Sequence, residues 1–270
     1  MDKYTVLWMG PPGTGKSYGA ATVAKLGKTL LLACKGREAR SIGYVQNKKN
    51  VDTEIYEDVK WTPSLKRFQA DAYMNLLRRL DALYEDDTYD AVIIDPFTDF
   101  AGSIAHHILA PIGVGSPGDM ADTFAFYVSL KDKADEAIRL ATGLATHAKR
   151  PKHVIVTMHV QPPKEEQIIK GVAKPSADKV ARGIEYEGSV LPMIDGAYRR
   201  KMAGDFDIVI YSGVDQRFNK KSKKQEPWYY IQISPDRDKH SKIAVGIPTT
   251  DQIDNDFSKL LEAISVGPTK

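Results

Sequence analysis

Eight consecutive residues have types and spacing suited to phosphate chemistry. They read Gly10-Pro11-Pro12-Gly13-Thr14-Gly15-Lys16-Ser17 and fit the pattern G-x-x-x-x-G-K-[ST]. Glycines allow the backbone to wrap closely around a phosphate and to turn its N–H groups inward. In this pattern the lysine reaches the β- and γ-phosphates, and the Ser17 hydroxyl can ligate Mg²⁺. We therefore predict that these residues, with the adjoining Tyr18, bind ATP and Mg²⁺.

A second polar group follows an apolar run, in Val92-Ile93-Ile94-Asp95. The run predicts a buried strand, and Asp95 would lie at its carboxyl end. Ligands of parallel α/β sheets bind at that edge. We expect Asp95 to hold Mg²⁺ through water, opposite Ser17. The alternative is an acid that caps the next helix.

Hydrolysis also needs a base or a group that positions water. Glu38, a few residues beyond the second predicted strand, is one candidate, and a solvated loop acid is its alternative. His159 follows the fourth predicted strand and could sense the γ-phosphate through a hydrogen bond. A structural histidine is the alternative there.

The elements that would position these groups alternate along the chain. Continuous apolar strands are predicted at Tyr4–Met9, Thr29–Cys34, Tyr89–Asp95 and His153–Met158. Amphipathic helices are predicted at Ser17–Leu26, Leu65–Tyr84 and Met120–Ala148. This alternation indicates a mostly parallel sheet covered on both faces. A long polar loop, 160–188, would be followed by antiparallel strands at Ile194–Arg200, Asp207–Tyr211 and Trp228–Ser234, and by a final helix capped by Thr250.

Composition is ordinary for a globular protein, with 42% apolar and 27% charged residues among 270. We expect one domain over residues 1–270. The single cysteine, Cys34, excludes a disulfide framework and a multi-cysteine zinc site, and favours a reducing, cytoplasmic setting. No apolar run reaches about eighteen residues, so no membrane partner is expected. The net charge of +3 argues little about partners.

Three stretches carry a resemblance: Tyr89–Phe97, His153–His159 and Trp228–Ile264. Together with the motif spacing, they resemble the RecA-like ATPases. More closely, the chain resembles phage nucleotide-binding proteins of the Sak-four type of single-strand annealing proteins. The resemblance implies a RecA-like P-loop NTPase core, with a mostly parallel sheet flanked by helices and antiparallel strands near the C-terminus.

For function, the resemblance implies a DNA recombination protein that binds single-stranded DNA as an ATP-dependent ring or filament. It implies a DNA-stimulated ATPase in the cytoplasm of an infected bacterial host, with a single-strand-binding protein as a further partner. One feature departs from the family. The family tends to carry an acid directly after the second strand, in a stretch like Asp-Thr-Glu-Gly, whereas this chain reads Ala33-Cys34-Lys35-Gly36-Arg37-Glu38. Because the acid is displaced, we expect slow hydrolysis, or ATP used mainly as a conformational ligand.

The DNA loops of RecA-like proteins map to 110–122 and 160–183. The second loop carries Lys164, Lys170, Lys174, Lys179 and Arg182. The turn between the late strands carries Arg217, Lys220, Lys221, Lys223 and Lys224, next to Phe218. Clustered basic groups neutralise phosphates and aromatic groups stack on unpaired bases, although a solvated charge run remains the alternative. The resemblance also makes Arg237 and Lys242 candidates to reach the γ-phosphate of a neighbouring subunit.

Two other classes of protein share the phosphate-binding pattern. A nucleoside or nucleotide kinase would usually place an arginine-rich lid over its acceptor, but residues 158–182 contain one arginine. A non-catalytic ATP-switched adaptor would bind ATP without DNA-stimulated turnover.

Overall fold

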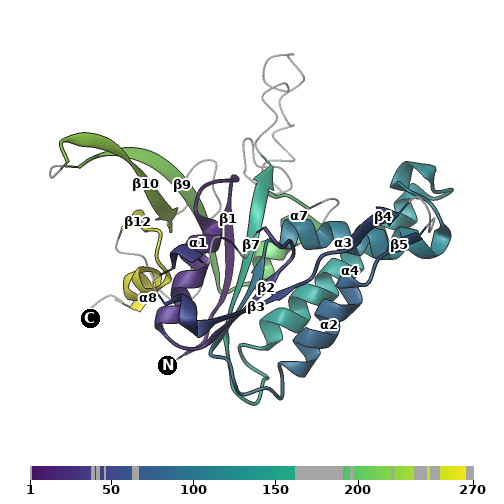
Figure 1. Ribbon diagram of the computed structural model, residues 1–270, viewed down its shortest axis with the longest axis horizontal. Coiled ribbons are helices and arrows are strands. Elements are labelled where there is room, and N and C mark those ends of the chain that lie inside the picture. Colours follow the sequence, from purple (N-terminus) through teal and green to yellow (C-terminus); the bar gives the residue numbers. More distant parts are fainter. Residues whose placement is uncertain are drawn as a thin grey trace, which may run out of the picture.

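A computed structural model describes residues 2–37, 40, 43–45, 47–62, 67–161, 191–194, 198–219, 222–233, 242–243 and 250–265. Most of its strands join one mixed sheet in the order β12-β10-β9-β1-β7-β6-β2-β3, with β11 beside β9 and β8 beside β7. Figure 1 shows this sheet crossing the molecule between two layers of helices.

The centre of the sheet is parallel from β9 to β3. Its strands are β1 (Thr5–Gly10), β2 (Thr29–Ala33), β3 (Val51–Ile55), β6 (Ala91–Asp95), β7 (His153–Gln161) and β9 (Ile208–Asn219). Antiparallel strands extend the sheet beyond β9: β10 (Lys224–Gln232), β11 (Lys242–Ile243) and β12 (Gln252–Asp254). The two-residue β8 (Leu191–Pro192) pairs with the end of β7. The predicted fold class is confirmed.

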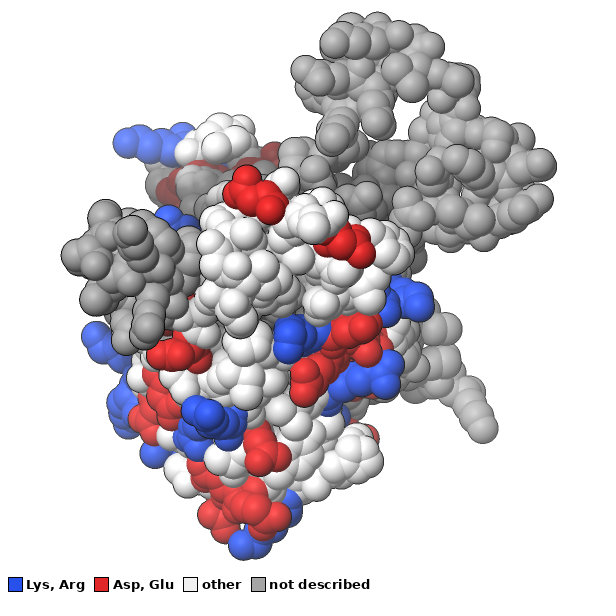
Figure 2. All heavy atoms as spheres, turned by 90° about the vertical axis from the view of Figure 1, so that its right-hand side faces the viewer, with Lys and Arg blue, Asp and Glu red and all other residues white. Residues whose placement is uncertain are grey.

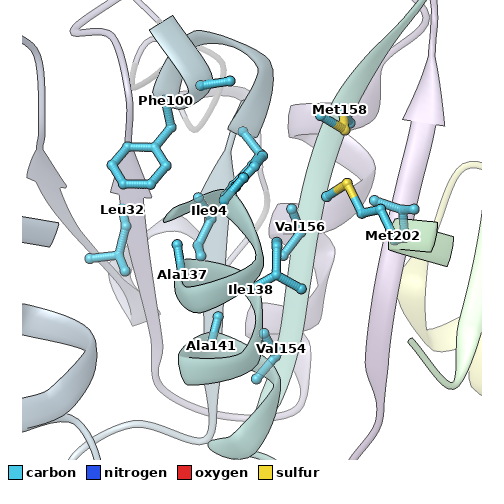
Figure 3. Packing of buried hydrophobic residues seen from close by; sticks show 14 of the residues in the cluster. Leu32, Ile94, Phe100, Ala137, Ile138, Ala141, Val154, Val156, Met158 and Met202 are labelled. Atoms are coloured by element: carbon cyan, nitrogen blue, oxygen red, sulfur yellow. The ribbon is translucent and has the colours of Figure 1, made fainter. Parts of the chain in front are cut away.

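Helices cover both faces of the sheet, which explains its continuous apolar strands. One face carries α2 (Ala72–Ala82), α3 (Phe97–Leu109) and α4 (Thr123–Gly143), and the other carries α1 (Lys16–Ala21), the 3₁₀ turn η1 (Thr22–Lys25) and α8 (Phe257–Ser265). Strand β1 shows the division, because Leu7 and Met9 join the first core and Val6 and Trp8 the second. Figure 3 shows Ala137, Ile138 and Ala141 of α4 packed against Val154 and Val156 of β7.

Short elements complete the described chain. A separate two-stranded sheet is formed by β4 (Val59–Thr62) and β5 (Arg67–Gln69). The remaining pieces are η3 (Lys48–Asn50), η4 (Ala110–Ile112), η5 (Pro117–Asp119), α7 (Tyr198–Lys201) and η6 (Met202–Asp205). No helix in the described ranges has the length and apolar character needed to cross a membrane.

Several predicted boundaries are wrong. The helix predicted from Leu65 begins only at Ala72, because Arg67–Gln69 pairs as a strand. The strand predicted at Ile194–Arg200 is contradicted by α7, which buries Tyr198 in the core. The final helix is capped by Asp256, whose Oδ1 accepts the Ser258 N–H at 2.9 Å, and not by Thr250. The predicted loop 160–188 overlaps the end of β7, and its residues from 162 lie outside the described ranges.

Candidate nucleotide site

The glycine-rich segment forms a tight loop between β1 and α1. Gly13 and Gly15 both have φ of 80°, in the left-handed region that favours glycine. Gly10 is required for a different reason, since a Cβ there would lie 2.8 Å from the Ser212 carbonyl oxygen of neighbouring β9. The loop is therefore shaped by three glycines, two through backbone conformation and one through close approach.

Lys16 lies inside this loop and is only 5% exposed. Its Nζ donates to the carbonyl oxygens of Gly10, at 2.9 Å, and Pro11, at 2.8 Å. The Thr14 hydroxyl also donates to the Pro11 carbonyl, at 2.9 Å. The ammonium group is thus held over the loop that the sequence predicts to surround a phosphate. Ser17 follows it and is half-buried, and Tyr18 is 39% exposed.

Asp95 ends β6 at the same edge of the sheet. The side chain is 1% exposed, and its Oδ1 accepts a hydrogen bond from the Thr157 hydroxyl of β7. Strand β7 lies between β6 and β1, and its His159 is in register with Gly10 of the loop. The parallel register therefore brings the carboxyl ends of β1, β7 and β6 together, as the sequence predicts. Thr157 was not anticipated, because a buried threonine in a strand carries no distinctive pattern.

His159 is half-buried at that edge. Its backbone N–H donates to the Thr98 hydroxyl, 2.9 Å away on the first turn of α3. His159 lies at the predicted edge of the sheet, but within β7 and not after it, because the strand continues to Gln161. Its role as a γ-phosphate sensor stays a prediction.

An ion pair follows β2 at the same edge. Lys35 Nζ contacts Asp99 Oδ1 of α3, and Arg37 Nη2 lies 4.0 Å from Asp99 Oδ2. The pair is fixed beside Asp95, since the Cys34 N–H donates to the Asp95 carbonyl at 2.9 Å. The sequence showed basic residues where the resembled family carries an acid, but it did not show that Asp99 pairs with them. Glu38 lies outside the described residues.

The loop is also braced by the C-terminal segment. Asn255 is 7% exposed, and its Nδ2 donates to the Gly15 carbonyl at 2.8 Å. The Phe257 N–H donates to the Thr22 hydroxyl at 2.7 Å, and Lys25 pairs with Asp256. Burial raises the pKa of Asp256, but hydrogen bonds from Lys25 and Ser258 outweigh it and hold that pKa below its ordinary value. This bracing was not predicted, because it joins residues more than two hundred positions apart.

The predicted basic residues are only partly described. In the β9–β10 hairpin, Arg217 lies over the Trp228 ring, with its Cζ 4.6 Å from the ring centroid. Lys223 and Lys224 are exposed near the hairpin turn. Lys242 forms part of β11, with its side chain undescribed. The others lie outside the described residues: Lys164, Lys170, Lys174, Lys179, Arg182, Lys220, Lys221 and Arg237.

The sheet order, the loop between β1 and α1, and an acid at the end of β6 define a P-loop ATPase domain. Comparison with known families gives the particular group: a family model described as "AAA domain" matches residues 2–242, so the chain belongs to the AAA domain family.

Among solved structures, the chain is similar to a prototypical ATPase from the type III secretion system of pathogenic bacteria. The identity is 13% and the TM-score 0.42, over 78% of this chain and 52% of that one, so this chain spans about half the length of that ATPase. A comparison with curated proteins yields no match.

Proposed function

We propose that this chain binds ATP with Mg²⁺ and uses it to control binding of single-stranded DNA, as a recombination protein of the Sak-four annealing type. The observation that carries the nucleotide part is the meeting of the loop 10–17 and Asp95 at one edge of the sheet. A buried carboxylate and a hydroxyl fit Mg²⁺, which is usually held by one or two carboxylates, phosphates and water. Ser17 and Asp95 would hold the ion, which supplies charge neutralisation at the phosphates.

Strand order also gives the nucleotide a direction. Asp95 lies two strands from β1 on one side, and β10 lies two strands away on the other. The Mg²⁺-bearing phosphates must face Asp95, so the nucleoside is directed toward β9 and β10. Tyr229 of β10 is 42% exposed on that side, and its Cδ1 would lie 3.2 Å from a Cβ at Gly15. We assign Tyr18 and Tyr229 to the nucleoside side of the site.

Hydrolysis is expected to be slow. After β2, where the resembled family carries an acid, the described residues form a Lys35–Asp99 ion pair, so the carboxylate at this edge is already engaged by a lysine. Glu38 and His159 remain the proposed groups for positioning water and sensing the γ-phosphate. This arrangement favours ATP as a conformational ligand. It also supports the second candidate function, an adaptor switched by ATP without turnover.

The DNA part of the proposal rests on charge and on the resemblance. The segment 160–183 and the hairpin turn carry the clustered lysines and arginines that neutralise phosphates. The segment 110–122 contains Asp119 and Asp122 and no lysine or arginine, so we remove it from the proposed DNA surface. Arg237 and Lys242 stay candidates for completing a neighbour's site in an oligomer.

The test is ATPase activity with and without single-stranded DNA, run beside a gel shift with a non-hydrolysable ATP analogue. We expect slow turnover that DNA stimulates and a shift that needs the analogue. A gel shift without ATP hydrolysis would support the second candidate function, the ATP-switched adaptor. Phosphate transfer to a nucleoside or nucleotide, with no DNA shift, selects a kinase and contradicts the proposal.

A further inference from the structure

Helix α4 carries two apolar stripes, although one is enough to hold it on the sheet. The inner stripe, which includes Phe126 and Leu130, is buried in the core. The second stripe is Phe124, Tyr127 and Val128, spaced i, i+3 and i+4, and these side chains are 78%, 39% and 40% exposed. We call Phe124, Tyr127 and Val128 the α4 patch.

The α4 patch is bordered by acids. Asp119 accepts from the Ser116 hydroxyl at 2.9 Å, and Asp122 accepts from the Ala125 N–H at 3.0 Å. Among the described residues, neither carboxylate forms an ion pair with a lysine or arginine. The stripe ends at Lys131, whose charge is balanced by Asp132 at 2.9 Å. Figure 2, which looks onto this end of the molecule, shows a broad area of uncharged side chains with isolated acidic groups.

The β9–β10 hairpin carries a second exposed apolar surface. Antiparallel register sets Tyr229 opposite Val214 and Gln225 opposite Phe218, so these residues share one face of the hairpin. Phe218 is 56% exposed, and Val214 and Tyr229 are each 42% exposed. We call Val214, Phe218 and Tyr229 the hairpin face. Arg217 and Trp228 lie on the opposite face, where they stack on each other.

The two surfaces are complementary and lie apart. Near Phe218, the described end of the hairpin carries the exposed Lys223 and Lys224, whose charge suits the acids around the α4 patch. Figure 1 places the hairpin at the left end of the long axis, and the end of α3 with the start of α4 at the right end. One molecule therefore cannot bring its two surfaces together, whereas two molecules arranged head to tail can.

We propose that the hairpin face of one copy docks on the α4 patch of a second copy of this chain. Such a contact joins unlike surfaces, so it generates a ring if the rotation closes and a filament if it does not. It also places each neighbour beside a nucleotide site, because Tyr229 belongs to the hairpin face and borders Gly15. The inference rests on the proposed assembly of the chain and names the surfaces that make it.

The experiment uses two full-length variants. The patch variant is Phe124→Ser with Tyr127→Ser, and the hairpin variant is Val214→Ser with Phe218→Ser. All four side chains are exposed, so each variant should fold, and Met74→Ser, at a 37% exposed position on α2, is the matched control. Sedimentation velocity over a concentration series, with a non-hydrolysable ATP analogue, gives the state of assembly.

We expect the unmodified chain and the control to assemble beyond a dimer. Each double variant should weaken assembly by about 30-fold or more, the effect of truncating a central aromatic contact. A 1:1 mixture of the two variants should form a dimer and nothing larger, because one intact hairpin face and one intact α4 patch remain. The dimer also shows that both variants are folded.

Three results overturn the inference: a monomeric unmodified chain at every concentration, variants that assemble like the control, or a mixture of defective variants that stays monomeric. If the hairpin variant assembles like the control but loses DNA binding, the hairpin face is a DNA-binding surface instead. ATP affinity, measured on the monomeric variants, separates this inference from the proposed nucleotide site, which fails only if ATP does not bind.

Discussion

Alanine substitution at two glycines of the phosphate-binding loop separates the cost of a left-handed backbone conformation from the cost of crowding neighbouring side chains. Gly13 and Gly15 share a φ of 80°. Their surroundings differ, because a Cβ at Gly13 meets nothing within 4 Å, whereas one at Gly15 would lie 2.7 Å from Asn255 Nδ2 and 3.2 Å from Tyr229 Cδ1. The difference in folding free energy lost by Gly13→Ala and by Gly15→Ala therefore measures how closely the loop packs on the C-terminal segment and on β10.

The magnitudes follow from these contacts. A left-handed alanine costs about 1–2 kcal/mol, and this is the only cost to the folded state expected for Gly13→Ala, since its Cβ meets no neighbour within 4 Å. Crowding by an added methyl group costs about 1–3 kcal/mol more, so Gly15→Ala should lose roughly 2–5 kcal/mol. Stiffening of the unfolded chain is the same for both substitutions and cancels in the comparison.

Urea unfolding without nucleotide measures both losses, and a double variant identifies the neighbour. Asn255→Ala removes the nearer contact, so Gly15→Ala combined with Asn255→Ala should lose less than the sum of the two single variants, by about 1 kcal/mol or more. Equal losses for Gly13→Ala and Gly15→Ala, with additive behaviour of the double variant, would refute the packing of Asn255 beneath the loop.

Three further predictions concern the metal site, pH and DNA. Asp95→Asn should keep much of the ATP affinity and lose Mg²⁺-dependent turnover. Thr157→Val removes the hydrogen bond to Asp95 and should lower Mg²⁺-dependent turnover by about tenfold or more. Normal activity of Asp95→Asn at saturating Mg²⁺ would exclude Asp95 from the metal site. Burial lowers the pKa of His153 to about 4, so the neutral form is favoured in the folded state and stability falls as pH drops from about 6.5 toward 4. The loss should reach about 3 kcal/mol in urea unfolding and be reduced in His153→Gln, and an identical pH dependence of the two proteins would contradict this. Neutralising Lys170, Lys174 and Lys179 together should weaken single-stranded DNA binding and lower its log–log salt slope by up to about 0.7 per lost contact, with ATP binding preserved; an unchanged slope would move the DNA site to the hairpin turn.

The parallel core could be predicted from sequence because its signals are local. Runs such as Val92 to Ile94 are apolar throughout, as strands covered on both faces require, and the loop 10–17 has fixed spacing. The elements whose predicted structure was wrong have weak local signals in the sequence. Arg67–Gln69 pairs with β4, and that pairing overrides the helical spacing that continues from Ala72. Tyr198 lies in a short helix because its ring packs into the core, which the polar sequence around it does not show.

In the candidate site too, residues with a local sequence signal could be predicted, and residues that depend on long-range contacts could not. Its motif residues and Asp95 were predicted, and the sheet brings their strand ends together. The residues that support them were missed: Thr157 beside Asp95, Asp99 beside Lys35, and Asn255 beneath Gly15. Each of these contacts joins distant parts of the chain, so it depends on the assembled sheet and has no signature within either segment alone.

The most direct test of the account is the affinity of a fluorescent single-stranded oligonucleotide for the chain and for Lys16→Ala, with and without ATP and Mg²⁺. Lys16 is the cation held within the loop, and losing its bonds to phosphate should weaken ATP binding by about 10–100-fold. We predict that ATP strengthens DNA binding by the unmodified chain and has no effect on Lys16→Ala. Equal DNA affinity with and without ATP, or an undiminished response of Lys16→Ala to ATP, would contradict the account.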